Sequence, residues 1–258
     1  MKRIHLWEFE DLSWFPKNIR NYMTDFLQHV SHQFDLFKPI KEDLTSALKK
    51  MDESQILDLA SGGGGPWQKV AKHLGENRKD LKVELSDFYP NHPALERMVS
   101  KDPSVFSYSQ ESINALDVPK EKEGFRTQFL SFHHFKPENA KQIIQNAVDA
   151  KKGIAIFEAQ ERDISHLIKF ALSPINVLIL TPFIRPFKWG RLLFTYLIPL
   201  VPIFVFWDGL VSVLRTYSVK EMEAMAESLK NSDSYDWNIG KHKSMKGTVL
   251  YLIGTPKA

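Results

Sequence analysis

The sequence ILDLASGGGGPW, residues 56–67, decides how this chain folds. A short apolar run with an acid inside it leads into four consecutive glycines, and Pro66 then opens an amphipathic helix that we expect to reach Leu74. This is the pattern of a strand, a tight turn and a helix N-terminus. Glycines let backbone N–H groups approach a ligand at φ values that other residues resist, and a helix start leaves N–H donors unpaired. The stretch therefore predicts a cofactor-binding turn.

The spacing of the glycines bears on which cofactor the turn holds. A dinucleotide-binding fold favours the pattern Gly-x-Gly-x-x-Gly. The run offers two registers, residues 62–67 and 63–68, and each lacks the third glycine because Trp67 and Gln68 stand there. A nicotinamide dinucleotide is therefore disfavoured.

The next strand is predicted from Leu81 to Ser86, and Asp87 follows it. A carboxylate at that point can accept hydrogen bonds from both hydroxyls of a ribose, which suits either kind of nucleoside cofactor. The combined pattern is Asp58-x-Ala60-x-Gly62-x-Gly64, with Asp87 closing the next strand. It resembles the class I S-adenosyl-L-methionine-dependent methyltransferases, in which the turn holds the methionine end of the cofactor and has no pyrophosphate to neutralise.

The resemblance implies roles for individual residues. Asp58 would organise the turn and meet the methionine ammonium, Asp87 would hold the ribose, and Phe88 would line the adenine. Segment 113–119 is similar to the family's segment after the third strand, whose acid meets the adenine amino group; here that acid is Asp117. The predicted cofactor site comprises Asp58, Ala60, Ser61, Gly62, Gly63, Gly64, Asp87, Phe88, Asp117 and Ser131.

Strands and helices continue to alternate along the chain. We predict strands over residues 125–132, 153–158, 235–240 and 247–254, and helices over 137–150 and 219–229, the latter opened by a capping box of Ser218 and Glu221. This alternation predicts an α/β fold with a parallel sheet. The resemblance implies a Rossmann-like, seven-stranded, mostly parallel sheet with helices on both faces and an antiparallel last strand beside the fifth. Arg126 and Thr127 depart from the family, in which an acid often stands at this place.

Candidate catalytic groups follow two of these strands. His133 and His134 come at the end of the first, and Glu158 ends the second. Imidazole titrates near neutral pH, so either histidine could take a proton from a methyl acceptor. Neighbouring side chains on a strand face opposite ways, so we expect one histidine to pack inward and the other to face the pocket. The same geometry disfavours a shared metal ion, and no metal site is predicted. A structural role is the alternative for all three.

Candidate substrate-binding residues lie before and after this core. Helices predicted over 17–37 and 41–50 would cap the cofactor pocket. Family members often contact substrate through such helices, so the candidates there are Trp14, Phe15 and Arg20. Near the other end, the candidates are Trp207, Asp208, Arg215 and Tyr217. A buried ion pair would explain the polar cluster of Asp208 and Arg215 equally well.

Composition sets the broad class. The 258 residues are 43% hydrophobic and 25% charged, enough to bury one sizeable core. We expect a single domain, 1–258, with a helical cap (1–50), a cofactor-binding core (51–160), an apolar insert (162–206) and a segment that completes the sheet (207–258). The net charge of +3 is small and its basic residues are scattered, so a nucleic-acid partner is not favoured. The absence of cysteine excludes disulfides and thiolate metal sites.

Two apolar stretches without charged residues, 170–184 and 192–206, distinguish the insert. A helix of this length would rise roughly 22 Å, short of the ~30 Å hydrocarbon layer of a bilayer, and prolines interrupt both stretches. A simple transmembrane helix is therefore disfavoured. Three alternatives stay open: a lid over an apolar substrate, a peripheral membrane contact through residues 170–206, and an oligomer interface.

The sequence thus resembles that of an S-adenosyl-L-methionine-dependent methyltransferase whose acceptor is a small apolar molecule. The alternatives are a non-catalytic protein that binds the same cofactor and an NAD(P)-dependent oxidoreductase. Residues 1–11 lack the apolar core of a secretion signal, so we expect a cytoplasmic protein, with membrane association left open.

Overall fold

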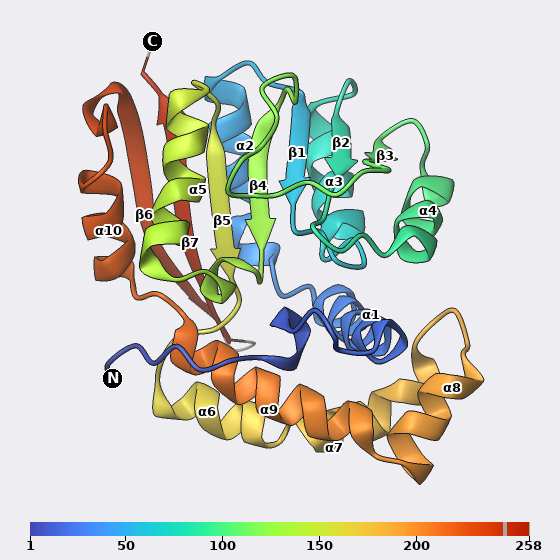
Figure 1. Cartoon of the computed structure of the whole chain (residues 1–258). Helices are drawn as coiled ribbons and strands as arrows, with labels where there is room; N and C mark the ends of the chain where they lie inside the picture. Colours follow the sequence, from blue (N-terminus) through green and yellow to red (C-terminus); the bar gives the residue numbers. More distant parts are fainter. Residues whose placement is uncertain (245–246, 258) are drawn as a thin grey trace.

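The computed structural model describes residues 1–244 and 247–257, and within them seven strands form one sheet (Figure 1). The order across the sheet is β3-β2-β1-β4-β5-β7-β6. The strands are β1 (Gln55–Leu59), β2 (Lys82–Leu85), β3 (Phe106–Tyr108), β4 (Phe125–Phe129), β5 (Ile154–Glu158), β6 (Tyr235–Ser244) and β7 (Gly247–Pro256). β7 pairs antiparallel with both β5 and β6, and the remaining pairs are parallel. The predicted sheet, with its last strand beside β5, is confirmed.

Helices cover both faces of the sheet because side chains alternate along each strand. Ile56 points to the face covered by α2, α3 and α4, whereas Leu57 points to the face covered by α5 and α10. These helices are α2 (Lys41–Lys50), α3 (Trp67–Asn77), α4 (His92–Lys101), α5 (Pro137–Asp149) and α10 (Val219–Glu227). The capping box of Ser218 and Glu221 opens α10 as predicted. The glycine turn lies between β1 and α3.

A further helical layer lies beyond the carboxyl ends of the parallel strands (Figure 1). It consists of α6 (Ile164–Ala171), α7 (Ser173–Leu180), α8 (Trp189–Leu192), the π-helical turn Leu193–Leu197 and α9 (Leu200–Arg215). Val177 of α7 and Val205 of α9 pack against Ile19 and Phe26 of α1 (Lys17–Phe34). The boundary predicted between residues 206 and 207 lies inside α9, because the apolar insert and the polar turns after it form one continuous helix.

No single helix in the described part of the chain is long and apolar enough to cross a membrane. Two helix pairs reach that length and composition only together. They are Ile164–Ala171 with Ser173–Phe183, bent by 41°, and Trp189–Leu197 with Leu200–Arg215, bent by 77°.

The end of β4 differs from the prediction. The strand stops at Phe129, and Leu130 adopts a left-handed φ of 51°, which turns the chain out of the sheet. His133 and His134 consequently lie on a 3-10 turn (Phe132–His134) and not on a strand. Their rings pack together with centroids 4.4 Å apart and planes inclined by 31°. Strand alternation therefore does not explain how they point, but the expected division between them is present: His133 is buried, and only His134 lines the cavity described below.

Candidate active site

A cavity opens at the carboxyl edge of the sheet, between the glycine turn, the end of β4 and α1. The cavity has a volume of about 190 Å³ and is partly open to solvent. Residues from the N-terminal segment and α1 line one side, namely Glu10, Arg20, Asn21, Thr24, Leu27, Gln28 and Ser31. The opposite side is lined by Ala60, Ser61, Gly62, Gly63, Gly65, Pro66, Asp87, Tyr89, Asn91, Phe129, Leu130, Ser131 and His134.

Asp58 organises the glycine turn from below the cavity. Its buried carboxyl accepts hydrogen bonds from Ser61 Oγ at 2.6 Å and from Thr127 Oγ1 at 2.7 Å. Burial raises the pKa of Asp58 to about 7, although the two hydroxyl donors act to lower it. Thr127, which departs from the family pattern, thus supplies a donor that fixes the turn. Asp58 does not line the cavity, and its contact with a methionine ammonium stays a prediction.

Four residues of the turn, Ala60, Gly62, Gly64 and Gly65, have positive φ angles. Ala60 has a left-handed φ of 57°, which is strained for a residue with a side chain. Gly64 has a φ of 98°, and a Cβ there would lie 2.6 Å from Met98 Cγ. Gln28 of α1 donates a hydrogen bond to the Gly63 carbonyl, so α1 covers part of the turn, while Ala60 and Gly63 still border open space. The turn is therefore accessible to a ligand.

Asp87 closes β2 on the same wall. Its Oδ2 accepts a hydrogen bond from the Gly62 N–H at 2.7 Å, and its Oδ1 accepts one from the Tyr89 N–H at 2.8 Å. Burial raises the pKa of Asp87, although both backbone donors act to lower it. Each carboxylate oxygen can accept a further bond, so Asp87 retains capacity for two hydroxyl donors from a ligand. The neighbouring Phe88 is half exposed and does not line the cavity.

Glu10 lies at the cavity opposite the turn, and sequence analysis did not identify it. Burial and, to a smaller extent, the nearby Asp208 raise the pKa of Glu10 to about 8. Its Oε1 is buried and has no hydrogen-bond partner among the described residues. Glu10 is therefore a carboxyl group at the cavity with an unused acceptor atom and a pKa near neutrality.

His134 lies beside Glu10 and carries a positive charge at neutral pH. Desolvation acts to lower its pKa, but Glu8, Asp11 and Glu10 outweigh this and raise the pKa to about 10. Its Nδ1 lies 2.8 Å from Asp11 Oδ1. A protonated imidazole cannot accept a proton, so this arrangement favours Glu10 over His134 as the base, and the catalytic role of His134 stays a prediction.

His133 and Glu158 form a buried pair that does not line the cavity. His133 Nδ1 lies 2.8 Å from Glu158 Oε2, and the His133 N–H donates to Glu158 Oε1 at 3.1 Å. Glu8, His133 and His134 place ligand atoms within 4.8 Å of one another, as a metal site would. Arg215 Nη1, however, already lies 3.0 Å from Glu8 Oε1, and this cation would oppose a metal ion. The prediction that the protein uses no metal remains a prediction.

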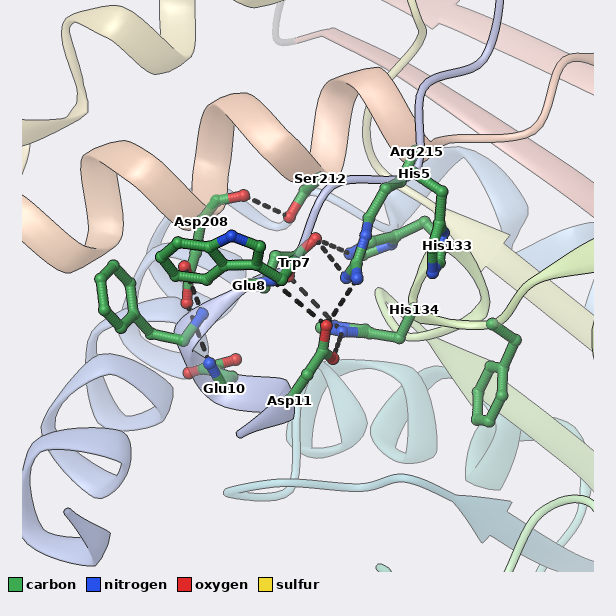
Figure 2. A network of polar contacts seen from close by, with 12 residues as sticks. His5, Trp7, Glu8, Glu10, Asp11, His133, His134, Asp208, Ser212 and Arg215 are labelled. Atoms are coloured by element: carbon green, nitrogen blue, oxygen red, sulfur yellow. Dashed lines mark hydrogen bonds and ion pairs between the residues drawn. The ribbon is translucent and has the colours of Figure 1, made fainter. Parts of the chain in front are cut away.

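α9 holds the N-terminal segment in place (Figure 2). Asp208 accepts hydrogen bonds from the N–H groups of Phe9 at 2.8 Å and Glu10 at 3.2 Å. Arg215 Nη2 lies 2.6 Å from Asp11 Oδ2. The backbone of residues 9–11 therefore has one defined position, which carries Glu10 to the cavity.

The other predicted substrate residues also lie away from the cavity, with one exception. Trp207 Nε1 donates to the Trp7 carbonyl at 3.1 Å, and Tyr217 Oη donates to the Phe135 carbonyl at 2.7 Å. None of the four candidates at positions 207–217 lines the cavity, and of these four Asp208 is the one that bonds to a lining residue, through the Glu10 N–H. Trp14 is exposed and Phe15 packs in the core between α1 and the insert, whereas Arg20 does line the cavity.

Asp117 is displaced from its predicted place. It borders a separate surface hollow beside α5, together with Glu138 and Gln142, and does not reach the cavity. The hydrogen bond from its N–H to the Asn114 carbonyl, 3.0 Å long, places it on a local turn. The insert also contributes no lining residue, because α1 lies between it and the cavity. The interpretation of the insert as a lid over this cavity is therefore wrong.

Comparison with known proteins identifies the fold. No protein-family model matches the sequence, and no curated protein matches it. Among solved structures, an O-methyltransferase family protein from Burkholderia thailandensis is similar, with a TM-score of 0.54, 12% identity, and 93% of this chain and 60% of that chain covered.

Two further solved structures are similar over most of this chain. The citrinin polyketide synthase CMeT domain gives a TM-score of 0.56 at 8% identity, covering 96% of this chain and 59% of that one. Human N-acetylserotonin methyltransferase in complex with S-adenosylmethionine gives a TM-score of 0.53 at 11% identity, covering 93% of this chain and 56% of that one. This chain has the class I methyltransferase fold. It spans about 60% of the length of these relatives.

Proposed function

We propose that the protein is an S-adenosyl-L-methionine-dependent methyltransferase that acts on a small acceptor. The observation that carries the proposal is the hydrogen bond of 2.7 Å from the Gly62 N–H to Asp87 Oδ2. It joins the glycine turn to the acid at the end of β2 on one wall of an open cavity, which is where this fold holds a nucleoside.

The residues present fit this cofactor. The cofactor would supply a methyl group on a sulfonium, which is transferred by in-line displacement. Asp87 has free acceptor capacity for a ribose, and the backbone of Gly62 and of the strained Ala60 lies at the cavity wall. Displacement at a sulfonium disperses positive charge, so the protein contributes mainly alignment and exclusion of water.

Glu10 would receive the proton of the acceptor. Its pKa of about 8 leaves it partly ionised at neutral pH, and its buried Oε1 has no protein partner among the described residues. The charged His134 beside it would stabilise negative charge on an acceptor oxygen as the proton leaves. Leu27, Phe129 and Leu130 supply apolar lining, which supports an acceptor with apolar surface. The name of the similar N-acetylserotonin methyltransferase also points to a small acceptor.

Calorimetric titration with S-adenosylhomocysteine, and separately with NADH, tests the cofactor assignment. We expect the homocysteine compound to bind and NADH not to bind. Binding of NADH alone would replace the proposal with the oxidoreductase alternative. A screen of small phenols, carboxylic acids and amines with radiolabelled S-adenosyl-L-methionine then separates an enzyme from a protein that only binds the cofactor.

A further inference from the structure

The outer side of the helical layer exposes an unusual amount of apolar surface. Of the 23 large apolar side chains that the described residues expose, 14 lie between Ile164 and Ile203. Trp189 and Leu197 are 78% and 76% exposed. Single exposed apolar residues are ordinary, but a concentration of this kind marks an interaction surface.

These side chains share one side of the layer. In α7, Val177 packs inward against α1, while Ile175 and Ile179 lie about half a helical turn away and are exposed. In α9, Val201 and Val205 pack inward and Ile203 is exposed. α6 and α7 both pack against α9. The surface is called the outer face below; its main members are Ile168, Ile175, Ile179, Phe183, Trp189 and Leu197.

The formal charges within residues 164–207 have one sign. Residues 164–207 contain Lys169, Arg185, Lys188 and Arg191 and no aspartate or glutamate. Lys188 and Arg191 pair with the buried Asp25, at 2.6 Å and 2.8 Å. Lys169 and Arg185 are exposed, and among the described residues neither has an acidic partner. Two cations that no acid neutralises thus accompany the apolar side chains.

We propose that the outer face docks on the surface of an anionic lipid bilayer. Apolar side chains would enter the boundary between headgroups and acyl chains, while Lys169 and Arg185 would meet anionic headgroups. Trp189, the most exposed of these side chains, is of the type enriched at this interface. A symmetric pair of copies would instead bring the same cations toward each other in an apolar interface, which is unfavourable. The proposal does not depend on methyl transfer.

Vesicle flotation tests the proposal with the full-length chain. One set of vesicles contains equal parts of phosphatidylglycerol and phosphatidylcholine, and the other contains phosphatidylcholine alone. We expect the protein to float with the anionic vesicles and several-fold less with the neutral ones. The double variant Ile179→Glu with Leu197→Glu should stay in the aqueous fraction, because both changes place a carboxylate where acyl chains would lie.

A matched pair of charge reversals separates the outer face from overall charge. Lys169→Glu should lower binding to the anionic vesicles by about fivefold or more. Lys79→Glu makes the same change in net charge before β2, at the opposite edge of the sheet, and should bind as the wild type does. All of the substituted residues except Lys79 are on the outer face or its rim, and circular dichroism and the melting temperature confirm that each variant is folded.

Several results would overturn the proposal. If the wild-type protein stays in the aqueous fraction in the presence of anionic vesicles, the proposal is wrong. Equal loss of binding in Lys169→Glu and Lys79→Glu would show that net charge alone attracts the protein. A dimer in sedimentation that the double variant dissociates, without vesicle binding, would assign the outer face to a second copy of the chain. Titration with S-adenosylhomocysteine is independent of all these results, so a failure here is distinct from a failure of the methyltransferase proposal.

Discussion

His134 Nδ1 lies 2.8 Å from Asp11 Oδ1, and this contact joins the turn after β4 to the N-terminal segment. The two residues are 123 positions apart, and Arg215 of α9 completes the group through Asp11 and Glu8. Charged groups from three distant parts of the chain therefore fix one wall of the cavity.

This pairing makes stability depend on pH. The pKa of His134 is raised from its ordinary 6.5 to about 10 in the folded protein. Its stabilising contribution is therefore complete below pH 6.5 and is lost as the pH rises toward 10. We expect the melting temperature to fall over this window, and to fall less in His134→Gln. An NMR titration of the His134 ring that gives an ordinary pKa would contradict this prediction.

Glu10 should show a pH dependence of the same sign in a lower window. Its pKa rises from 4.5 to about 8, so the unfolded chain releases the proton first and stability falls as the pH increases between these values. Glu10→Gln removes the buried charge and should melt at a higher temperature than the wild type at pH 8 and above. At pH 4 the two proteins should melt at similar temperatures. Thermal scans across this range measure both, and a variant less stable at high pH would exclude the assigned pKa.

Loss of Arg215 should destabilise the fold strongly. The guanidinium is buried and pairs with Glu8 and Asp11, so Arg215→Ala leaves these two carboxylates with His134 as the one remaining cation that the described residues place beside both of them. We expect a loss of about 3–5 kcal/mol in the free energy of unfolding, measured with urea. Arg78→Ala, which removes a partly exposed pair with Asp52, is the control and should cost about 1 kcal/mol or less.

Asp87 should decide cofactor affinity. Asp87→Ala removes the acceptor for the Gly62 N–H and the group expected to hold a ribose, so the Kd for S-adenosylhomocysteine should rise about ten- to a hundredfold. Asp117→Ala is the matched control, because Asp117 lies outside the cavity, and its Kd should stay at the wild-type value. If only the Asp117 variant binds weakly, Asp117 contacts the adenine, as the family resemblance implies.

Local patterns predicted six of the seven described strands, because each of these is marked by its own apolar run and bounding turns. β3 (Phe106–Tyr108) is only three residues long and was implied by the family resemblance alone. The strand after Gly124 was predicted to be three residues longer than β4 because residues 130–132 are also mainly apolar. Only the left-handed φ of Leu130 ends it, and hydrophobicity does not encode that angle. The relation of the glycine turn to Asp87 was also predictable, since the carboxyl ends of adjacent parallel strands share an edge.

The position of Glu10 at the cavity could not be predicted from local sequence patterns. Glu10 lies on a short turn without periodicity, and the residue that fixes its backbone, Asp208, is 198 positions away. Asp208 and Arg215 were noticed as a polar group after an apolar stretch, with a buried ion pair as one explanation. In the structure Arg215 does form buried ion pairs, with Glu8 and Asp11, whereas Asp208 accepts hydrogen bonds from the backbone of Phe9 and Glu10.

Because residues 8–11 are held by α9, the parts of the site become available in a fixed order as the chain is synthesised. A growing chain that has left the ribosome as far as β5 already contains the glycine turn and Asp87. Until α9 has been synthesised, the carboxylate of Asp208 is not there to accept from the Phe9 and Glu10 N–H groups, and the carboxylates of Glu8 and Asp11 have no guanidinium to pair with. The residues that would bind the nucleoside are thus synthesised well before the helix that fixes Glu10, the residue that would contact the methyl acceptor.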